Sequence, residues 1–495
     1  MDVTTSITAV GTPSGEVRRE LPESWSWIPL GEIVEIHDHR RRPIKAQDRQ
    51  TRIQGKSSAE LFPYYGATGQ VGLIDGFLFD FPAILLGEDG APFLDRQRAK
   101  AYAVEGNYWV NNHAHILTPK GSVLARWLLH SLNFVDYEPH VGGTTRLKLT
   151  KGDLEQIPIP LAPLPEQRRI VARIDELFAE IAAGEAALAD ARKGLETFRR
   201  ALLKAAVTGE LTRDWRTNQP TSESGDDVLK RIGKNAASNG RKRRIASAAQ
   251  LDTSDLPTLP ETWSWAQLGE LGEIVGGITV DKKRKPETAV TVPYLRVANV
   301  QRGHIDLSEV KSIVVERTSA ERLRLQEGDL LLNEGGDRDK IGRGWVWDGS
   351  IPDMIHQNHV FRVRLNDKAL NSYFVSHYAN ELGRRFFVEQ GKQTTNLASI
   401  SLSKVMTLPV PVPPPAETEE IVRRVSEALS IADDTLAQLD AEAADAARLE
   451  QAILKSAFEG RLVPQDPADE PASALLARIA PPTSGSKGKR RGRKA

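Results

Sequence analysis

Two long stretches of the chain place apolar residues at alternating steps of four and three. In the first, the apolar or small residues are Ile170, Ile174, Leu177, Ile181, Gly184, Leu188, Ala191, Leu195, Phe198, Leu202 and Ala205. The second runs from Val422 to Ile453, with one extra step of three between Ala446 and Leu449. This spacing is typical of helices that bury a narrow seam against a partner helix. We predict helices over 163–211 and 413–462, each about 45 residues and roughly 67 Å long.

The segments around these helices occur twice. The repeated pieces are Leu21-Pro-Glu-Ser-Trp-Ser-Trp27 with Leu259-Pro-Glu-Thr-Trp-Ser-Trp265, Ile157-Pro-Ile-Pro160 with Leu408-Pro-Val-Pro411, and residues 202–209 with 453–460. Between them, the inserts 37–140 and 275–400 share little sequence beyond length. Gene duplication with drift is one explanation, but drift blurs frame and inserts alike. A preserved frame with dissimilar inserts favours recognition of two different targets.

Both inserts carry short apolar runs bounded by Gly, Pro and Asp, which predict strands. Such runs occur at 61–69 and 83–90 in the first insert, and at 293–300 and 359–364 in the second. Short helical patterns follow, over 123–132 and 371–381. The inserts are therefore expected to be mixed α/β domains.

The remaining segments are polar. Residues 212–258 form a linker rich in Ser, Asn, Gly and charge, which includes Arg241-Lys-Arg-Arg244. Residues 1–20 and the basic tail of the C-terminal segment 463–495 are expected to be disordered. The tail could touch phosphates without specificity, or remain a solvated tail with no role.

Composition narrows the function classes. The chain has 495 residues, enough for two or more domains, and no cysteine, which excludes disulfides, cysteine-based zinc sites and a cysteine nucleophile. No signal-like start and no run of 18 apolar residues occur, so we expect a cytoplasmic protein without a membrane span. Lys and Arg together number 66, as do Asp and Glu. A protein that binds nucleic acid alone through bulk charge is usually basic, so this neutrality counts against a stand-alone nucleic-acid binder.

The sequence offers no strong enzyme motif. It contains no Gly-x-Gly-x-x-Gly after a strand, no Walker phosphate loop, no His-Glu-x-x-His and no Gly-x-Ser-x-Gly. His37-x-His39 and His113-x-His115 could ligate a metal, but no further ligands cluster with them in the sequence. We therefore expect neither a catalytic nor a metal site in this chain.

Base-reading residue types gather in the inserts. All ten histidines lie there, along with Asn111-Asn-His113, Gln357-Asn-His359 and the Gly-rich basic loop 333–343. Asn, Gln, His and Arg side chains hydrogen-bond base edges. Each motif also has a structural interpretation: amide side chains cap turns, and the Gly-rich loop could be a plain hairpin.

In combination, these motifs resemble the specificity subunits of type I restriction–modification systems. The matching residues are Leu21-Pro-Glu-Ser-Trp25 and its repeat, Pro163-Leu-Pro-Glu-Gln-Arg-Arg-Ile-Val171, Lys204-Ala-Ala-Val-Thr-Gly-Glu-Leu211 and its copy, Tyr64-Tyr-Gly-Ala-Thr-Gly69, and Trp109-Val-Asn-Asn-His113. The likeness covers about residues 20–480. The second copy departs from the usual Leu-Pro-x-Gln at Pro415-Ala-Glu-Thr418.

The resemblance implies an α+β fold: two mixed α/β target-recognition domains, 21–162 and 259–412, joined by two long antiparallel coiled-coil helices in a pseudo-twofold internal repeat. Each domain would read one half of a bipartite site on double-stranded DNA. The candidate DNA contacts are Tyr65, Thr68, Asn111, Asn112, His113, Arg146 and Lys148 in the first domain, and Arg296, Asn299, Arg338, Lys340, Arg343, Gln357, Asn358 and Asn396 in the second.

The resemblance also implies partners. Two methyltransferase (modification) subunits would dock on the helices, with optional restriction/translocase subunits. These partners would supply the S-adenosylmethionine, ATP and Mg sites, and the target adenine would be flipped into the methyltransferase. Two other hypotheses stay open: an assembly scaffold whose inserts bind protein, and a cryptic enzyme with an unrecognised insert fold.

Overall fold

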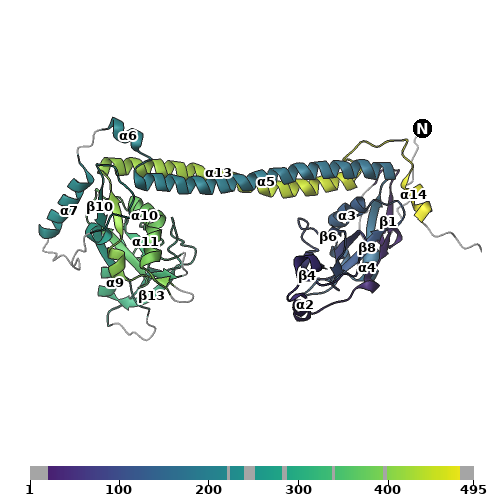
Figure 1. The fold of residues 1–495 in the computed structure, drawn as a ribbon, viewed down its shortest axis with the longest axis horizontal. Coiled ribbons are helices and arrows are strands. Elements are labelled where there is room, and N and C mark those ends of the chain that lie inside the picture. The colour runs from purple at the N-terminus through teal and green to yellow at the C-terminus, as the bar shows by residue number, and fades with distance from the viewer. Residues whose placement is uncertain are drawn as a thin grey trace, which may run out of the picture. The chain divides into compact units, whose positions relative to one another are not determined.

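The computed structural model describes residues 21–219, 223–238, 251–280, 287–336, 340–393 and 398–479 (Figure 1). The chain divides into two compact units, Met1–Ala189 with Leu439–Ala495, and Asp190–Gln438. Each unit contains one globular domain and part of each long helix. The N-terminal 20 residues, the basic cluster at 241–244 and the C-terminal basic tail lie outside the described residues.

The first domain contains two sheets and a separate strand pair. One sheet has the order β2 (Val34–Ile36), β8 (Ala114–Pro119), β5 (Ala83–Gly87) and β6 (Ala101–Val104). The other has the order β4 (Gly69–Ile74), β3 (Phe62–Gly66) and β7 (Trp109–Val110), and β1 (Ser26–Pro29) pairs with β9 (Pro158–Leu161). The helices are α1 (Leu30–Ile33), α2 (Ala46–Ile53), α3 (Ala125–Phe134) and α4 (Lys151–Glu155).

The second domain repeats this topology. Its four-stranded sheet has the order β11 (Gly272–Gly276), β18 (Val360–Leu365), β14 (Leu330–Asn333) and β16 (Gly344–Val346). A sheet of β13 (Lys311–Glu316), β12 (Ala289–Leu295) and β17 (Ile355–His356) and a pair of β10 (Ser264–Gln267) with β21 (Pro409–Val412) complete the match. A small sheet adds β15 (Gly335–Gly336), β20 (Ala398–Ser399) and β19 (Lys392–Gln393). The helices are α8 (Leu268–Leu271), α9 (Arg317–Leu323), α10 (Ser372–Glu381), α11 (Gly383–Gln390) and α12 (Leu402–Met406).

The internal repeat therefore extends through inserts whose sequences have diverged. In both domains the central strand of the three-stranded sheet pairs in parallel with a two-residue strand: Tyr64 lies opposite Trp109, and Tyr294 opposite Ile355. Alternation of buried residues and backbone pairing sets such a topology. Different side chains can meet these requirements, which is why the likeness of the inserts is not visible in their sequences.

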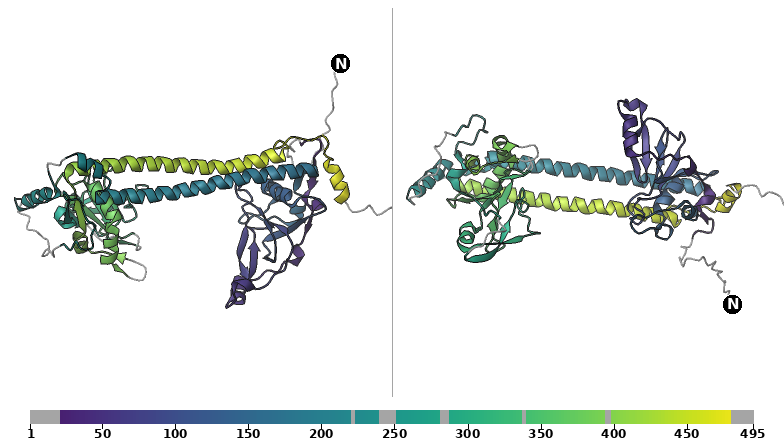
Figure 2. Two further views of the ribbon diagram at one scale, coloured as in Figure 1. Left: turned by 45° about the horizontal axis from the view of Figure 1, so that its top comes forward. Right: turned by 90° about the horizontal axis from the view of Figure 1, so that it is seen from below.

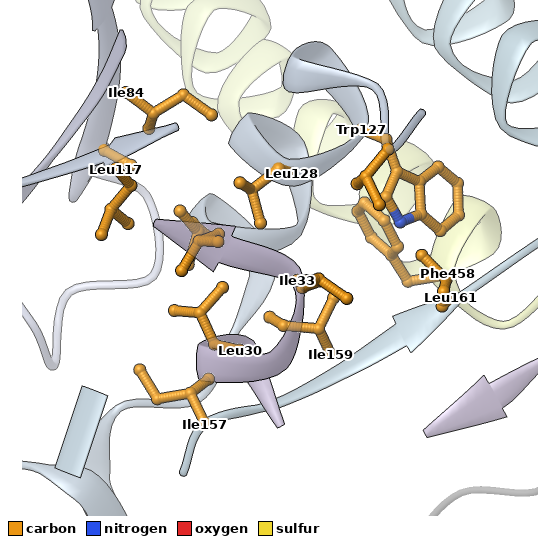
Figure 3. Close-up of a cluster of buried hydrophobic side chains, with 14 of the residues drawn as sticks. Leu30, Ile33, Ile84, Leu117, Trp127, Leu128, Ile157, Ile159, Leu161 and Phe458 are labelled. Atoms are coloured by element: carbon orange, nitrogen blue, oxygen red, sulfur yellow. The ribbon is translucent and has the colours of Figure 1, made fainter. Parts of the chain in front are cut away.

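Aromatic side chains fix the first domain to the end of a long helix (Figure 3). The fully buried Trp127 lies edge-on to Trp25, with ring centroids 5.4 Å apart, and to Phe458, at 4.9 Å. Leu30, Ile33 and Ile159 extend this cluster. In the second domain Trp263, the counterpart of Trp25 in the repeat, lies edge-on to Phe374, with ring centroids 5.8 Å apart.

The two long helices are α5 (Leu164–Thr208) and α13 (Pro415–Phe458), close to the predicted bounds. In the first unit Ile170 and Ile174 share a buried cluster with Ile453. In the second unit Val207 shares one with Ile421 and Val425. In each unit the end of one helix lies beside the start of the other, so the pairing is antiparallel (Figure 1; Figure 2).

Four residues expected in the helical seams are exposed instead: Gly184, Ala191, Phe198 and Leu449. Phe198 on α5 is 46% exposed and Leu449 on α13 is 52% exposed. A helix of 3.6 residues per turn drifts by about 20° per heptad from a stripe with a period of 3.5. Near the end of α5 the buried residues are Leu202, as predicted, together with Ala206 and Val207 outside the predicted stripe. On α13 the step of three takes Leu449 off the buried stripe.

The segment expected as a linker, 212–258, contains two helices, α6 (Arg213–Asn218) and α7 (Gly225–Ser238). Val228 and Ile232, four residues apart, bury one face of α7 in the second unit. The sequence conceals this helix because only a short apolar stripe interrupts its polar residues. The C-terminal segment likewise holds α14 (Ala472–Ile479), which packs on the first unit. Among the described residues, no helix is long and apolar enough to cross a bilayer.

Candidate nucleic-acid interface

Four segments of the first domain meet at Glu88 and Asp89, directly after β5. Lys148 Nζ lies 3.1 Å from Glu88 Oε1, and Arg41 Nη1 lies 2.6 Å from Glu88 Oε2. Arg146 Nη2 and His113 Nδ1 each lie 2.7 Å from Asp89 Oδ1. We name this group the first loop cluster; it consists of Arg41, Glu88, Asp89, His113, Arg146 and Lys148. Its two carboxylates thus hold three cations and an imidazole at one edge of the sheet.

A buried histidine supports this cluster from below. His115 is 1% exposed; its Nδ1 lies 2.6 Å from Asp38 Oδ2 and its Nε2 lies 2.9 Å from the Leu149 carbonyl. Burial opposes ionisation of Asp38, but the hydrogen bond to His115 and the Arg41 charge outweigh it and lower the pKa of the carboxyl. The same holds for Glu88. Burial acts to raise the pKa of its carboxyl, but the hydrogen bonds from Arg41 and Lys148 outweigh burial, and the pKa is lowered.

Asp38, Glu88 and His115 bring three possible metal-ligand atoms within 4.8 Å of one another. However, the Arg41 guanidinium already lies 2.6 Å from Glu88 and 3.4 Å from Asp38. A cation at this place would have to displace the Arg41 guanidinium from both carboxylates. We therefore assign no metal to the three residues.

The first-domain candidates lie close together. Asn111 Oδ1 accepts a hydrogen bond from the His113 amide at 2.8 Å, the capped turn that was the structural interpretation of this motif. Asn112 is exposed beside it. The backbone N–H of Asn111 donates to the Tyr65 carbonyl at 3.0 Å. Thr68 is exposed in the turn between β3 and β4. Tyr65 itself packs against other tyrosine rings, 5.8 Å from Tyr102 and 6.0 Å from Tyr108.

The second domain has an equivalent junction after β14. The Glu334 amide donates to the His359 carbonyl at 2.9 Å, and the Ile400 amide donates to the Glu334 carbonyl at 2.8 Å. In the first domain the Glu88 amide donates to His113, and Leu149 donates to Glu88, both at 2.8 Å. Glu334 and His359 therefore occupy the places of Glu88 and His113.

The second-domain candidates form two groups. Gln357 and Asn358 are partly exposed and immediately precede His359. Lys340 and Arg343 belong to the Gly-rich loop 333–343, and Arg343 Nη2 lies 3.4 Å from the Val297 carbonyl. Arg338 and Asn396 lie outside the described residues.

Two further candidates of the second domain belong to the loop 296–309. Arg296 Nη2 donates to the Glu309 carbonyl at 2.8 Å. Asn299 is 3% exposed, and its Nδ2 donates to the carbonyls of Asp306, at 2.8 Å, and Glu309, at 3.0 Å. Both donors of this amide are used within the protein, so Asn299 supports the loop from inside.

A basic segment that the candidate list omitted lies beside the first loop cluster. The Arg40 guanidinium lies 5.0 Å from the Phe79 ring centroid, Arg49 lies 4.6 Å from that of Tyr64, and Arg52 lies 5.2 Å from that of Trp109. Arg42 and Lys45 are exposed. The sequence signal was available, because three arginines occur in a row at 40–42, ahead of the Arg49 and Arg52 pair on α2.

Comparison with known proteins agrees with this duplicated architecture. A family model described as the type I restriction modification DNA specificity domain matches residues 22–189 and 260–443. The chain belongs to this family. Each match covers one globular domain and the first part of the long helix that follows it.

Two relatives of this family match over most of their length. The type I restriction enzyme EcoDI specificity subunit of Escherichia coli is 24% identical over 483 residues, which cover 96% of this chain and 99% of that protein. The EcoKI specificity subunit of Escherichia coli strain K12 is 27% identical over 399 residues, covering 77% of this chain and 76% of that protein.

A solved structure shares the fold of this chain. It comes from work on complex assembly and conformational transition of the type I R-M system, and it aligns with a TM-score of 0.59. The alignment covers 90% of this chain and 100% of that one, at 18% identity. The fold of this chain, two domains with long helices between them, is therefore shared with that solved structure.

Proposed function

We propose that this chain is the sequence-reading subunit of a type I restriction–modification complex. Each globular domain reads one half of a bipartite site on double-stranded DNA, and the helices set the separation of the half-sites. Phosphate contacts fix the register and base contacts give the specificity. The chain itself carries no catalytic group in this proposal.

The observation that carries the proposal is a repeated topology with different side chains at one edge. In both domains the loops after β5 or β14 and after β7 or β17 meet through the same backbone hydrogen bonds. The polar residues at this edge differ: Arg146, Lys148 and Asn112 in one domain, Asn358 and His359 in the other. Two similar frames with different polar edges suit two different base sequences.

The partners follow from the same proposal. Two methyltransferase subunits dock on α5 and α13, and restriction/translocase subunits join them in a restriction-competent complex. S-adenosylmethionine, ATP and Mg bind to these partners. A target adenine is flipped into the methyltransferase, since an enzyme cannot reach a stacked base inside a duplex.

Long-read mapping of methylated adenines in the host tests the proposal. We expect a bipartite motif that disappears when the gene is deleted. Replacing residues 37–140 with the corresponding insert of another family member should change one half of the motif only. A motif that survives deletion, or that changes in both halves, would contradict the proposal.

Binding assays separate the proposal from a pure assembly scaffold. The complex with its partner subunits should prefer its own site, and its affinity should fall steeply with salt because counterions are released from the DNA. A scaffold whose inserts bind protein would show no sequence preference and little dependence on salt.

A further inference from the structure

Both domains hold a histidine at the same place in the fold, against a carboxylate of the loop that follows β5 or β14. His113 follows β7 and His359 follows β17, each after two amide residues. His113 Nδ1 lies 2.7 Å from Asp89 Oδ1, and His359 Nδ1 lies 2.7 Å from Glu334 Oε2. Asp89 and Glu334 occupy neighbouring but different positions of this loop. The two imidazoles therefore keep the same type of contact although the residues that supply it differ, which indicates a shared role.

The two imidazoles reach solvent while their carboxylates are more shielded. The side chain of His359 is 55% exposed and that of Glu334 is 29% exposed. The corresponding values are 35% for His113 and 18% for Asp89. In each pair the carboxylate thus lies on the protein side of the ring, and the ring is the outer member.

The carboxylate contact also sets the chemistry of the outer nitrogen. A ring that donates from Nδ1 to a carboxylate keeps Nε2 as its acceptor in the neutral form. The structure contains such a contact in the second domain, where Asn358 Nδ2 lies 3.4 Å from His359 Nε2. In the major groove the exocyclic amino groups of adenine and cytosine are donors of the same kind as this amide.

We infer that His113 and His359 are equivalent base-reading residues, one in each half-site. Each accepts a hydrogen bond through Nε2 from the amino group of an adenine or a cytosine. Asp89 and Glu334 are positioning residues, which hold the rings in this orientation. The inference rests on the proposed function and extends it to a specific pair of contacts. One of them, His359, was not among the candidate DNA contacts predicted from the sequence.

Selection from a randomised duplex library tests the inference. The full chain, purified with the partner subunits that accompany it in its host, is used as wild type, His113→Ala and His359→Ala. Each variant should lose discrimination of about 5- to 150-fold at one base pair of one half-site. The two variants should affect opposite half-sites, so that each serves as the control for the other.

The carboxylate is tested in the second domain, because Asp89 also holds Arg146. Glu334→Ala should weaken discrimination at the same base pair as His359→Ala. Glu334→Gln, which keeps an acceptor for Nδ1, should retain most of it. A merely structural role for the pair would lower the affinity for all sequences equally and leave the preferred base unchanged.

The outcomes separate this inference from the proposed function. If the wild-type complex selects no bipartite sequence, the proposed function fails. If it selects one and His359→Ala leaves every base preference unchanged, only the pairing of these histidines with bases is overturned.

Discussion

The two globular domains place different side chains on the same backbone positions. In the first domain the backbones of Asp89 and Lys148 pair in an isolated β-bridge. At the matching place in the second domain the backbone of Gly335 pairs with that of Ser399. The first domain therefore has two carboxylates at this junction, and the second has only Glu334 among the described residues. The histidine binds Asp89 in one case and Glu334 in the other. Backbone pairing preserves the junction, and its side chains are free to differ.

The helical frame differs in a similar way beneath the same tryptophan. Trp25 Nε1 donates to Glu166, and Trp263 Nε1 donates to Glu417, both at 2.9 Å. Glu166 then binds the neutral amide of Gln465, whereas Glu417 binds the Arg216 guanidinium, at 2.7 Å. The frame thus tolerates a change from a neutral to a charged partner.

The largest expected effect is on this pair of glutamates. Glu417→Ala leaves Arg216 without its buried partner and should cost roughly 3–5 kcal/mol. Glu166→Ala loses contacts with neutral donors and should cost only about 1–3 kcal/mol. Hydrogen exchange of β10 and β21, compared with β1 and β9, reports the two units separately. Equal losses in both units would contradict the assigned difference.

The next effect concerns one residue at the end of each long helix that packs into the core of a unit. Phe458 in the first unit matches Val207 in the second within the repeated helix ends. Phe458→Val removes ring contacts with Trp127 and Phe134 and should cost about 2 kcal/mol. Val207→Phe should also destabilise its unit, by about 1–3 kcal/mol, because it overpacks the core. Denaturant titrations measure both, and a neutral exchange would mean that the two cores are interchangeable.

A smaller effect is expected for the basic segment of the first domain. Lys45→Gln should weaken binding to all DNA sequences alike and lower the salt slope by about 1. Lys230→Gln on α7, a lysine paired with Asp226 at 2.6 Å, is the matched control and should leave the slope unchanged. Loss of preference at a single base pair in Lys45→Gln would instead assign it a base contact.

The smallest effect is a dependence of stability on pH. Burial raises the pKa of Glu166 above its usual value of 4.5, against the hydrogen bonds from Trp25 and Gln465. The folded state therefore keeps a proton that the unfolded state has lost, and the unfolding free energy falls as pH rises through this window. Glu166→Gln should remove that fall, as measured by unfolding at several pH values. A pH profile identical to wild type would contradict the shift.

The sequence predicted the long helices better than the loops of the candidate DNA interface. Heptads and repeated motifs located α5 and α13 to within a few residues, because a long periodic pattern is a strong signal. The sequence could not show that the divergent inserts share one strand order, since backbone hydrogen bonds determine that order. Nor could it show that Asn299 points inward or that His359 binds Glu334, because these contacts join segments far apart in the chain.

The two units differ in whether their residues are contiguous in the sequence. Residues of the second unit are contiguous, from Asp190 to Gln438, whereas the first unit needs Leu439 onward, including Phe458 against Trp127. A ribosome adding roughly 5–20 residues per second takes about 10–50 s to make the intervening segment. During that time the first domain exists with the Trp127 face uncovered. Synthesis therefore completes the later unit before the earlier one, and the nascent protein is most vulnerable to aggregation at its own beginning.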